Sequence, residues 1–292
     1  MDQAEKLRNI IKANQTNQRP LARVITVTSG KGGVGKSNTA INLAIQFKKM
    51  GNRVIILDAD FGLANIEIMF GTVPKHNLSD LIYQGKNIKD VITWGPGEIG
   101  FISGGSGIAG LSNLSRDYLM YIIQNLAELD SLADVVIIDT GAGISDAVLE
   151  FLVASGEILL VTTPEPTSIT DAYSLLKSLS GHKRFSLENS QIKVIANRVG
   201  TKEEGRDLFE KLNTVVTKYL KLPIAYLGSV PQDVQLSKAV MQQAPVCLAS
   251  PSAKSAKAFV EIAEILMNGP ERDTVQKRGM AAFFSHILSG KK

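Results

Sequence analysis

The sequence predicts a single α/β domain with a mostly parallel sheet flanked by helices on both faces. Six short apolar runs, each suited to a strand buried on both sides, alternate with longer segments that have helical spacing of apolar residues. Alternation of this kind indicates βαβ crossovers, because neighbouring parallel strands need a long connection. With 292 residues, 44% of them hydrophobic, the chain can bury a large core.

The expected elements follow one another without a visible domain break over residues 20–268. Strands are expected at 24–28, 54–57, 135–138, 158–161, 193–196 and 225–230. Helices are expected at 39–50, 118–129, 146–154, 172–179, 208–219 and 256–267. Residues 1–19 are expected to form a short helix and a polar linker. After the break at Gly269 and Pro270, residues 269–292 are expected to form a separate helical tail.

Charge and cysteine content exclude some classes of protein. The formal net charge of +4 permits an anionic partner but does not select one. Cys247 is the only cysteine, so an internal disulfide and a cluster held by several cysteines of one chain are excluded. The first residues lack the apolar stretch of a signal peptide, and no apolar run reaches the ~18 residues of a membrane span. A cytoplasmic, non-redox protein is expected.

The segment GKGGVGKS carries the clearest chemical signal. It follows a predicted buried strand and precedes a predicted helix, which is the context of a phosphate-binding P-loop. Lys36 is expected to reach the β- and γ-phosphates, and the Ser37 hydroxyl to bind Mg²⁺. The complete motif favours this nucleotide site over a glycine-rich turn without a ligand. The predicted contacts are Gly30, Lys31, Gly32, Gly33, Val34, Gly35, Lys36, Ser37 and Asn38.

Lys31 adds a second lysine to the loop. With it, the segment resembles the deviant Walker A motif, KGGxGK[ST], of the ParA/MinD family of ATPases. In that family the first lysine crosses a dimer interface and contacts the nucleotide of the partner. The resemblance therefore implies an ATP-dependent homodimer, with catalytic roles for Lys31 and Lys36. It also places Glu165, followed by Pro166, among the contacts near this interface. The alternative is a solvated lysine beside the loop.

Two further strand ends carry acidic residues where the resemblance expects them. Asp60 matches the family's switch I aspartate, which orients the attacking water near Mg²⁺, and Asp58 would support it from behind. Asp139 would hold Mg²⁺ through water, and the Gly143 N–H would meet the γ-phosphate. Either acidic motif alone could be a helix N-cap. Together with Ser37 as a metal ligand, they imply slow, Mg²⁺-dependent hydrolysis of ATP to ADP and phosphate.

The segment after residue 192 bears on the nucleotide base. Asn197 and Arg198 lack an acid two residues beyond the basic one, as a guanine site would have, so ATP is favoured over GTP. The pair matches the family's adenine-side residues, although Asn197 could also be a simple helix cap. Pro231 and Asp233 resemble the family's second base-side loop.

The two ends of the chain indicate a branch of the family. Residues 2–8, DQAEKLR, resemble the activator segment of the flagellar-number regulators known as FlhG, YlxH or FleN. In that subgroup the segment stimulates the GTPase FlhF, and Gln3 is the candidate to position the attacking water. The resemblance also implies flagellar switch-complex partners and control of flagellar number and placement. The alternative for these residues is a frayed amphipathic helix.

The C-terminal tail predicts contact with a membrane. Apolar residues recur there with helical spacing among basic residues, as in a helix that lies on an anionic membrane surface. Peripheral, ATP-dependent membrane association is therefore expected, and a helix docked on the domain's own core is the alternative. Gly279 weakens the helical pattern. The predicted membrane contacts are Met280, Phe283, Phe284, Ile287 and Leu288.

Two other functions stay open at this stage. A DNA-partitioning ATPase of the same family would use basic residues such as Lys177, Lys183, Arg184 and Arg206, although nucleic acid is not the expected partner. An ATP-binding adaptor would bind the nucleotide with little hydrolysis. Family members that hold an iron–sulfur cluster at the dimer interface are excluded, because they need interface cysteines that this chain lacks.

Overall fold

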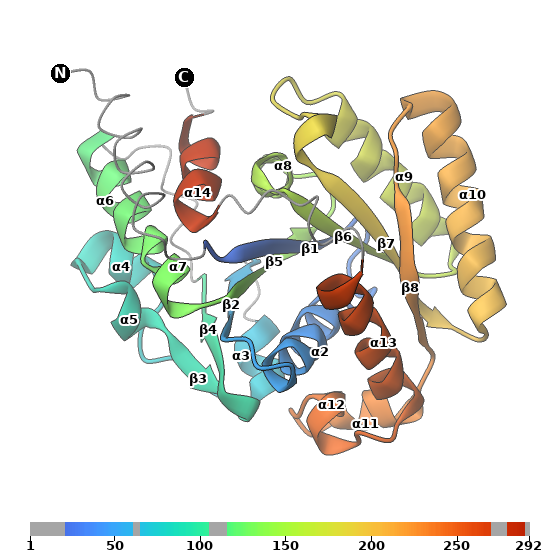
Figure 1. The fold of residues 1–292 in the computed structure, drawn as a ribbon, viewed down its shortest axis with the longest axis horizontal. Coiled ribbons are helices and arrows are strands. Elements are labelled where there is room, and N and C mark those ends of the chain that lie inside the picture. Colours follow the sequence, from blue (N-terminus) through green and yellow to red (C-terminus); the bar gives the residue numbers. More distant parts are fainter. Residues whose placement is uncertain (1–20, 61–64, 105–115, 270–278, 290–292) are drawn as a thin grey trace.

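The structure, a computed structural model, describes residues 21–60, 65–104, 116–269 and 279–289. It confirms the predicted fold class: an eight-stranded sheet lies between two layers of helices (Figure 1). The strand order is β3-β4-β2-β5-β1-β6-β7-β8, and only the edge pair β3–β4 is antiparallel. The strands are β1 (Arg23–Ser29), β2 (Val54–Ala59), β3 (Thr93–Gly95), β4 (Ile99–Ile102), β5 (Val135–Ala142), β6 (Glu157–Thr162), β7 (Gln191–Val199) and β8 (Ala225–Pro231).

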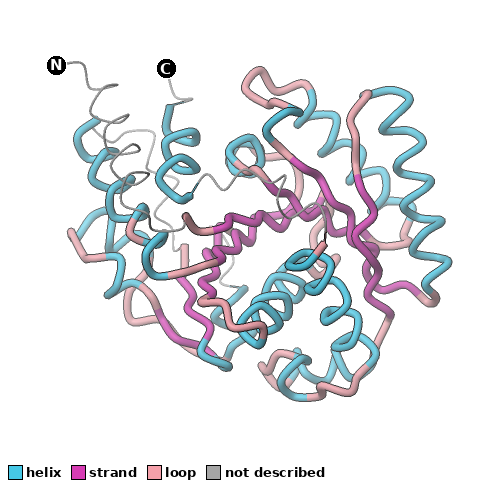
Figure 2. Tube along the Cα trace, in the orientation of Figure 1, coloured by secondary structure: helices cyan, strands magenta, loops and turns pink. Residues whose placement is uncertain are grey.

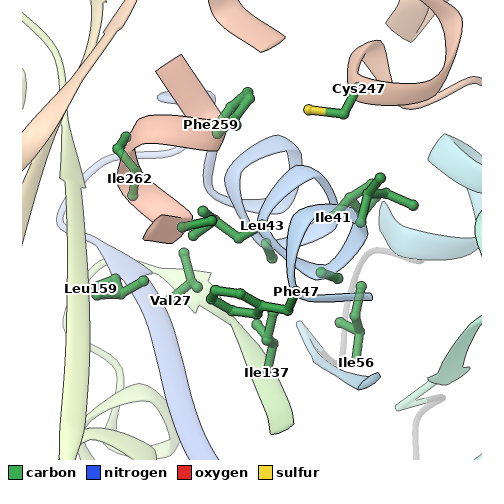
Figure 3. Close-up of a cluster of buried hydrophobic side chains, with 14 of the residues drawn as sticks. Val27, Ile41, Leu43, Phe47, Ile56, Ile137, Leu159, Cys247, Phe259 and Ile262 are labelled. Carbon is green, nitrogen blue, oxygen red and sulfur yellow. The ribbon is translucent and has the colours of Figure 1, made fainter. Parts of the chain in front are cut away.

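One face of the sheet is covered by α2 (Lys36–Lys49) and α13 (Lys254–Asn268), which lie side by side (Figure 1). The short helices α3 (Asn65–Phe70), α11 (Val234–Met241) and α12 (Val246–Ala249) complete this layer. In Figure 3, Phe47 of α2 lies among Val27, Ile56 and Ile137 of the central strands. Every labelled side chain in that view is buried, so the helix that begins in the P-loop is anchored on the core.

The opposite face carries two groups of helices. Over β6 and β7 lie α8 (Asp146–Ala154), α9 (Pro166–Ser180) and α10 (Lys202–Leu220). Over β2, β4 and β5 lie α4 (Leu78–Gln84), α5 (Ile88–Val91), α6 (Arg116–Ala127), α7 (Leu129–Leu132) and α14 (Gly279–Ser289). The tube in Figure 2 shows the twisted sheet running through the molecule between these layers. No helix in the described part of the chain is both long and apolar enough to cross a bilayer.

All six predicted strands are present, and the parallel arrangement brings their carboxyl ends to one edge of the sheet. The register places Asp58 of β2 directly opposite Asp139 of β5, and it pairs Ser29 at the end of β1 with Ala142. Ligands of open parallel sheets bind at this edge, where helix N-termini and strand ends meet. The predicted P-loop and the two acidic motifs therefore converge on one place.

The structure extends two predicted helices toward their N-termini. Helix α9 begins at Pro166 rather than at residue 172, and proline suits the first helical position because its missing N–H needs no partner there. Helix α10 begins at Lys202 rather than at residue 208. Its N-cap is Thr201, whose hydroxyl accepts a hydrogen bond from the Glu204 N–H. Both starts contain cap signals that apolar periodicity alone does not reveal.

Candidate nucleotide-binding site

The loop from Gly30 to Ser37 joins the end of β1 to the start of α2. Gly33 and Gly35 have φ angles of 74° and 100°, a left-handed conformation that glycine adopts without steric cost. Gly35 is the N-cap of α2, and no side chain of the described residues caps the free N–H groups there. A helix start left open in this way favours an anion, through its N–H donors and the helix dipole.

Neighbouring elements fix the shape of this loop. The buried Asn197 side chain, at the end of β7, donates a hydrogen bond of 2.7 Å from Nδ2 to the Val34 carbonyl. On the other side, a Cβ added to Gly30 would lie 2.2 Å from the backbone of Asp171 in α9. The loop is thus held between β7 and α9 before any ligand arrives, which lowers the entropy cost of binding phosphate.

The predicted contact at Gly143 is already engaged within the chain. Its N–H donates to the Ser29 carbonyl at 2.9 Å, which joins the end of β5 to the end of β1. Gly143 has a φ of 88°, and a Cβ there would meet nothing within 4 Å. To meet a γ-phosphate, as the sequence predicts, this N–H has to leave its present acceptor.

Asp139 lies at the centre of the site and is completely buried. Among the described residues, neither of its carboxylate oxygens has a hydrogen-bond partner by geometry. Burial raises the pKa of Asp139 to about 6, against the opposing effects of the Ser37 hydroxyl and the Lys36 ammonium nearby. A buried carboxylate whose oxygens lack a hydrogen-bond partner in the described part of the chain, with a serine hydroxyl nearby, fits an Mg²⁺ site, since hard oxygen ligands suit that ion.

Asp58 and Asp60 differ in their surroundings although they are two residues apart. Asp58 is buried and accepts hydrogen bonds from the N–H groups of Asp60 and Ile66, at 3.1 and 3.2 Å. Burial and the nearby charge of Asp139 raise the pKa of Asp58 to about 7. Asp60 is only half-buried, and its Oδ2 accepts a hydrogen bond of 3.0 Å from Asn65 Nδ2. This arrangement suits the supporting role predicted for Asp58, and the half-buried Asp60 is compatible with the water-orienting role predicted for it.

Lys31 turns toward the start of α9. Its Nζ donates to Glu165 Oε2 at 2.7 Å and to Thr167 Oγ1 at 2.8 Å. The hydrogen bond and charge of Lys31 hold the pKa of Glu165 below its usual value, and the charge of Arg198 acts in the same direction. Within one chain, the structure therefore brings together the predicted Lys31, Glu165 and Arg198.

The base-side residues lie at the ends of β7 and β8. Arg198 is exposed at a positive φ of 58°, and its N–H donates a hydrogen bond of 2.9 Å to Asn197 Oδ1. Pro231 ends β8. Asp233 caps α11 by accepting from the Gln235 N–H through Oδ1, while Oδ2 accepts from both the N–H and the hydroxyl of Ser255. Asp233 thus fixes the loop that follows β8, and its contact with the base stays a prediction.

Two polar side chains at this site did not enter the sequence prediction. Asn65 contacts Asp60, and Thr167 contacts Lys31. Asn65 begins the short helix α3, shortly after Asp60. Thr167 lies in the first turn of α9, shortly after Glu165, and the start of that helix was predicted too late. A search for polar residues in the first turn after each predicted strand would have found both.

The predicted membrane helix is docked in this structure. Met280, Phe283, Phe284 and Ile287 are all buried against α6 and α8, and the Phe151 and Phe283 rings lie 6.0 Å apart. Gly279 begins α14 at a φ of 67°, where a Cβ would lie 2.6 Å from an Asp130 oxygen. Contact with a membrane would require release of this helix. The Leu288 side chain and Gln3 lie outside the described residues.

Comparison with known proteins agrees with this geometry. Residues 25–246 match the family described as CobQ/CobB/MinD/ParA nucleotide-binding domain. The chain belongs to this family. It is 40% identical to the antiactivator FleN of Pseudomonas aeruginosa, over 91% of this chain and 93% of FleN. It is 32% identical to the flagellum site-determining protein YlxH of Helicobacter pylori, over 98% of both chains. The resemblance to the flagellar-number regulators is confirmed.

Solved structures of the family share the fold. The septum site-determining protein MinD of Pyrococcus horikoshii, complexed with Mg-ADP, superposes with a TM-score of 0.66 at 22% identity. The match covers 85% of this chain and 97% of that one. A putative plasmid partition protein of Borrelia burgdorferi, bound to AMPPNP, also has a TM-score of 0.66, at 21% identity. At these identities the similarity establishes the fold alone.

Proposed function

We propose that this family member is an ATP-dependent dimerising switch that regulates flagellar number and placement. The observation that carries the proposal is 40% identity to FleN over nearly the whole chain. Two features of the described residues support it: the P-loop helix starts without a side-chain cap, and the buried oxygens of Asp139 beside Ser37 have no hydrogen-bond partner at bonding distance among them. Mg²⁺ would be held by Ser37 and Asp139, with Asp60 at the exposed side of the site. ATP would be bound by the P-loop, with Asn197 and Arg198 on the base side.

Hydrolysis would proceed slowly, so that the ATP-bound state of the switch lasts. Asp60 would orient the attacking water, and its Oδ2 accepts a hydrogen bond from Asn65 Nδ2. We expect single-turnover ATP loss to slow at least about 100-fold in Asp60→Ala, the scale of a lost acid–base or positioning group. Glu67→Ala, which removes a half-buried acid from the helix that contains Asn65, α3, serves as the control. Equal rates in wild type and Asp60→Ala would instead support an ATP-binding adaptor.

Membrane association would follow from release of α14. In the docked state the side chains of Met280, Phe283, Phe284 and Ile287 are buried, so these four are not available to a lipid surface. We expect ATP to promote binding to vesicles that contain an anionic phospholipid, and deletion of residues 272–292 to abolish it. Vesicles of neutral lipid serve as the control. ATP-independent binding, or binding that survives the deletion, would contradict this part of the proposal.

The partner proposal concerns residues 1–20, which include Gln3. A peptide of this segment is expected to stimulate GTP hydrolysis by FlhF, with loss of stimulation in Gln3→Ala. No stimulation by the wild-type peptide would remove the activator role and leave the ATP switch unaffected. Flagellar switch-complex proteins are proposed as further partners on the resemblance alone.

A further inference from the structure

The contact between Lys31 and the start of α9 has a consequence for dimer formation. Lys31 uses two of its ammonium donors on Glu165 and Thr167 of its own chain. The proposed function requires the same ammonium to reach a nucleotide bound by the second copy. Since an ammonium has three donors, at most one is left for a phosphate of the second copy while both of these contacts persist. A full set of phosphate contacts therefore requires Lys31 to give up Glu165 and Thr167.

The structure builds this contact from fixed elements. Gly30, directly before Lys31, packs so closely on the backbone of α9 at Asp171 that no Cβ would fit. The P-loop and the start of α9 are thus held against each other. Glu165 is the N-cap of α9, but its side chain caps none of the helix N–H groups, so the carboxylate is available to Lys31.

The charges around this point also favour the resting arrangement before nucleotide arrives. Lys31 and Arg198 are both positive, and Glu165 is the acid whose pKa both of them lower. Once ATP fills the P-loop of a second copy, its γ-phosphate offers Lys31 a more highly charged acceptor. The carboxylate of Glu165 and that phosphate therefore compete for one cation.

We propose that Glu165 and Thr167 form a resting site for Lys31, which must be vacated before ATP joins two chains. This inference rests on the proposed function. Glu165 is then a positioning residue that raises the concentration of ATP-bound chain needed for association. By two-fold symmetry each dimer would vacate two such sites. Removal of an exposed ion pair is therefore expected to tighten the dimer about two- to tenfold in Kd.

The test measures the dimer dissociation constant with ATP by sedimentation velocity. The variants are Glu165→Gln, which removes the charge, and Glu165→Asp, which keeps the charge but shortens its reach. Both are expected to tighten the dimer, and Thr167→Val to do so to a smaller extent. Glu210→Gln, an exposed acid on α10, is the charge control and should match wild type. ATP affinity of the monomer is measured separately, so that a change in nucleotide binding is not mistaken for a change in association.

A second readout tests the contact without a dimer. Acylation of the Lys31 amine in nucleotide-free chain, followed by mass spectrometry, should be faster in Glu165→Gln than in wild type. The resting site would be overturned if the Glu165 variants dimerised like wild type or more weakly. It would also be overturned if Glu165→Gln tightened the dimer but Glu165→Asp did not. A wild-type chain that stays monomeric with ATP would contradict the proposed function, and unchanged acylation would contradict the contact itself.

Discussion

At the scale of single residues, the P-loop glycines have different structural roles. Gly30 faces the backbone of α9, with no space for a methyl group, whereas a Cβ on Gly32 would meet nothing within 4 Å. Gly32 is also exposed. The first glycine therefore serves packing of the protein, and the second leaves room on the side where phosphate is expected.

Gly30→Ala and Gly32→Ala test this division of roles. Gly30→Ala should lower the free energy of unfolding of nucleotide-free protein by about 1–3 kcal/mol, because the loop or α9 must shift. Gly32→Ala should leave that free energy within about 0.5 kcal/mol of wild type but weaken ATP binding. Urea unfolding and nucleotide titration measure the two effects. Equal stability loss in both variants would contradict the division.

Asn197 provides a second test at this scale. Its buried side chain braces the Val34 carbonyl, so Asn197→Ala should cost about 1–3 kcal/mol of stability and also weaken ATP binding. Asn189→Ala, which removes an exposed side chain that donates to Ser186 Oγ, is the control. Unchanged nucleotide affinity in Asn197→Ala would show that the loop keeps its shape without this brace.

The buried thiol of Cys247 leads to a prediction about how its labelling rate depends on pH. Burial raises the pKa of its thiol to about 11, despite opposing effects of Gln46 and Lys49. The reactive thiolate forms only as pH rises through that value, so native protein should resist a thiol reagent at pH 8 and still react slowly at pH 9. Labelling should become fast in urea. Rapid labelling of native protein at pH 8 would show that the α12 region opens readily.

At the scale of elements, apolar runs predicted the strands that support the site but missed the antiparallel edge of the sheet. β3 spans only residues 93–95, and the apolar run of β4 over residues 99–102 is interrupted by Gly100. The starts of α9 and α10 were missed because they are marked by Pro166 and by the N-cap Thr201, and not by apolar spacing. Thr167 was missed with the start of α9. The P-loop, in contrast, was recognised from its glycine and lysine pattern alone.

The apolar face of α14 could not show from sequence whether the helix docks on the domain, because such a face suits a membrane and a protein core equally. In this structure the contacts of α14 show that it is docked. Asp130 accepts from the Met280 N–H at 2.9 Å and from the Ala22 N–H at 3.2 Å. Arg184, weighed above as a DNA-binding residue, instead donates to the His286 carbonyl at 2.6 Å and pairs with Glu150. Both ends of the helix are thus fastened to the domain.

Truncation of a buried side chain tests this docking. Phe283→Ala should lower the free energy of unfolding of nucleotide-free protein by about 3–5 kcal/mol, since the ring is only 2% exposed. Ser285→Ala, which loses only a hydrogen bond within the same helix, should stay within about 0.5 kcal/mol. A neutral Phe283→Ala, measured by urea unfolding, would mean that α14 is not docked in solution.

At the scale of the whole molecule, the strand order explains why distant motifs meet. β1 lies between β5 and β6, and β2 lies beside β5, so the P-loop, Asp58 and Asp139 share one edge of the sheet. The site faces outward beside Lys31, Glu165 and the start of α9. In the proposed dimer, a second copy over this edge would cover the nucleotide, and ATP binding would thereby be linked to association.

The mass of the chain in solution tests this link most directly. Light scattering should give the 31.5 kDa monomer without nucleotide and with ADP, and twice that mass with Mg²⁺ and ATP in a chain whose hydrolysis is slowed by Asp60→Ala. Replacing Lys31 with Ala should abolish the ATP-dependent increase while ATP still binds. A monomer under all conditions, or an equal dimer with ADP and with ATP, would contradict the account of an ATP-controlled dimerising switch.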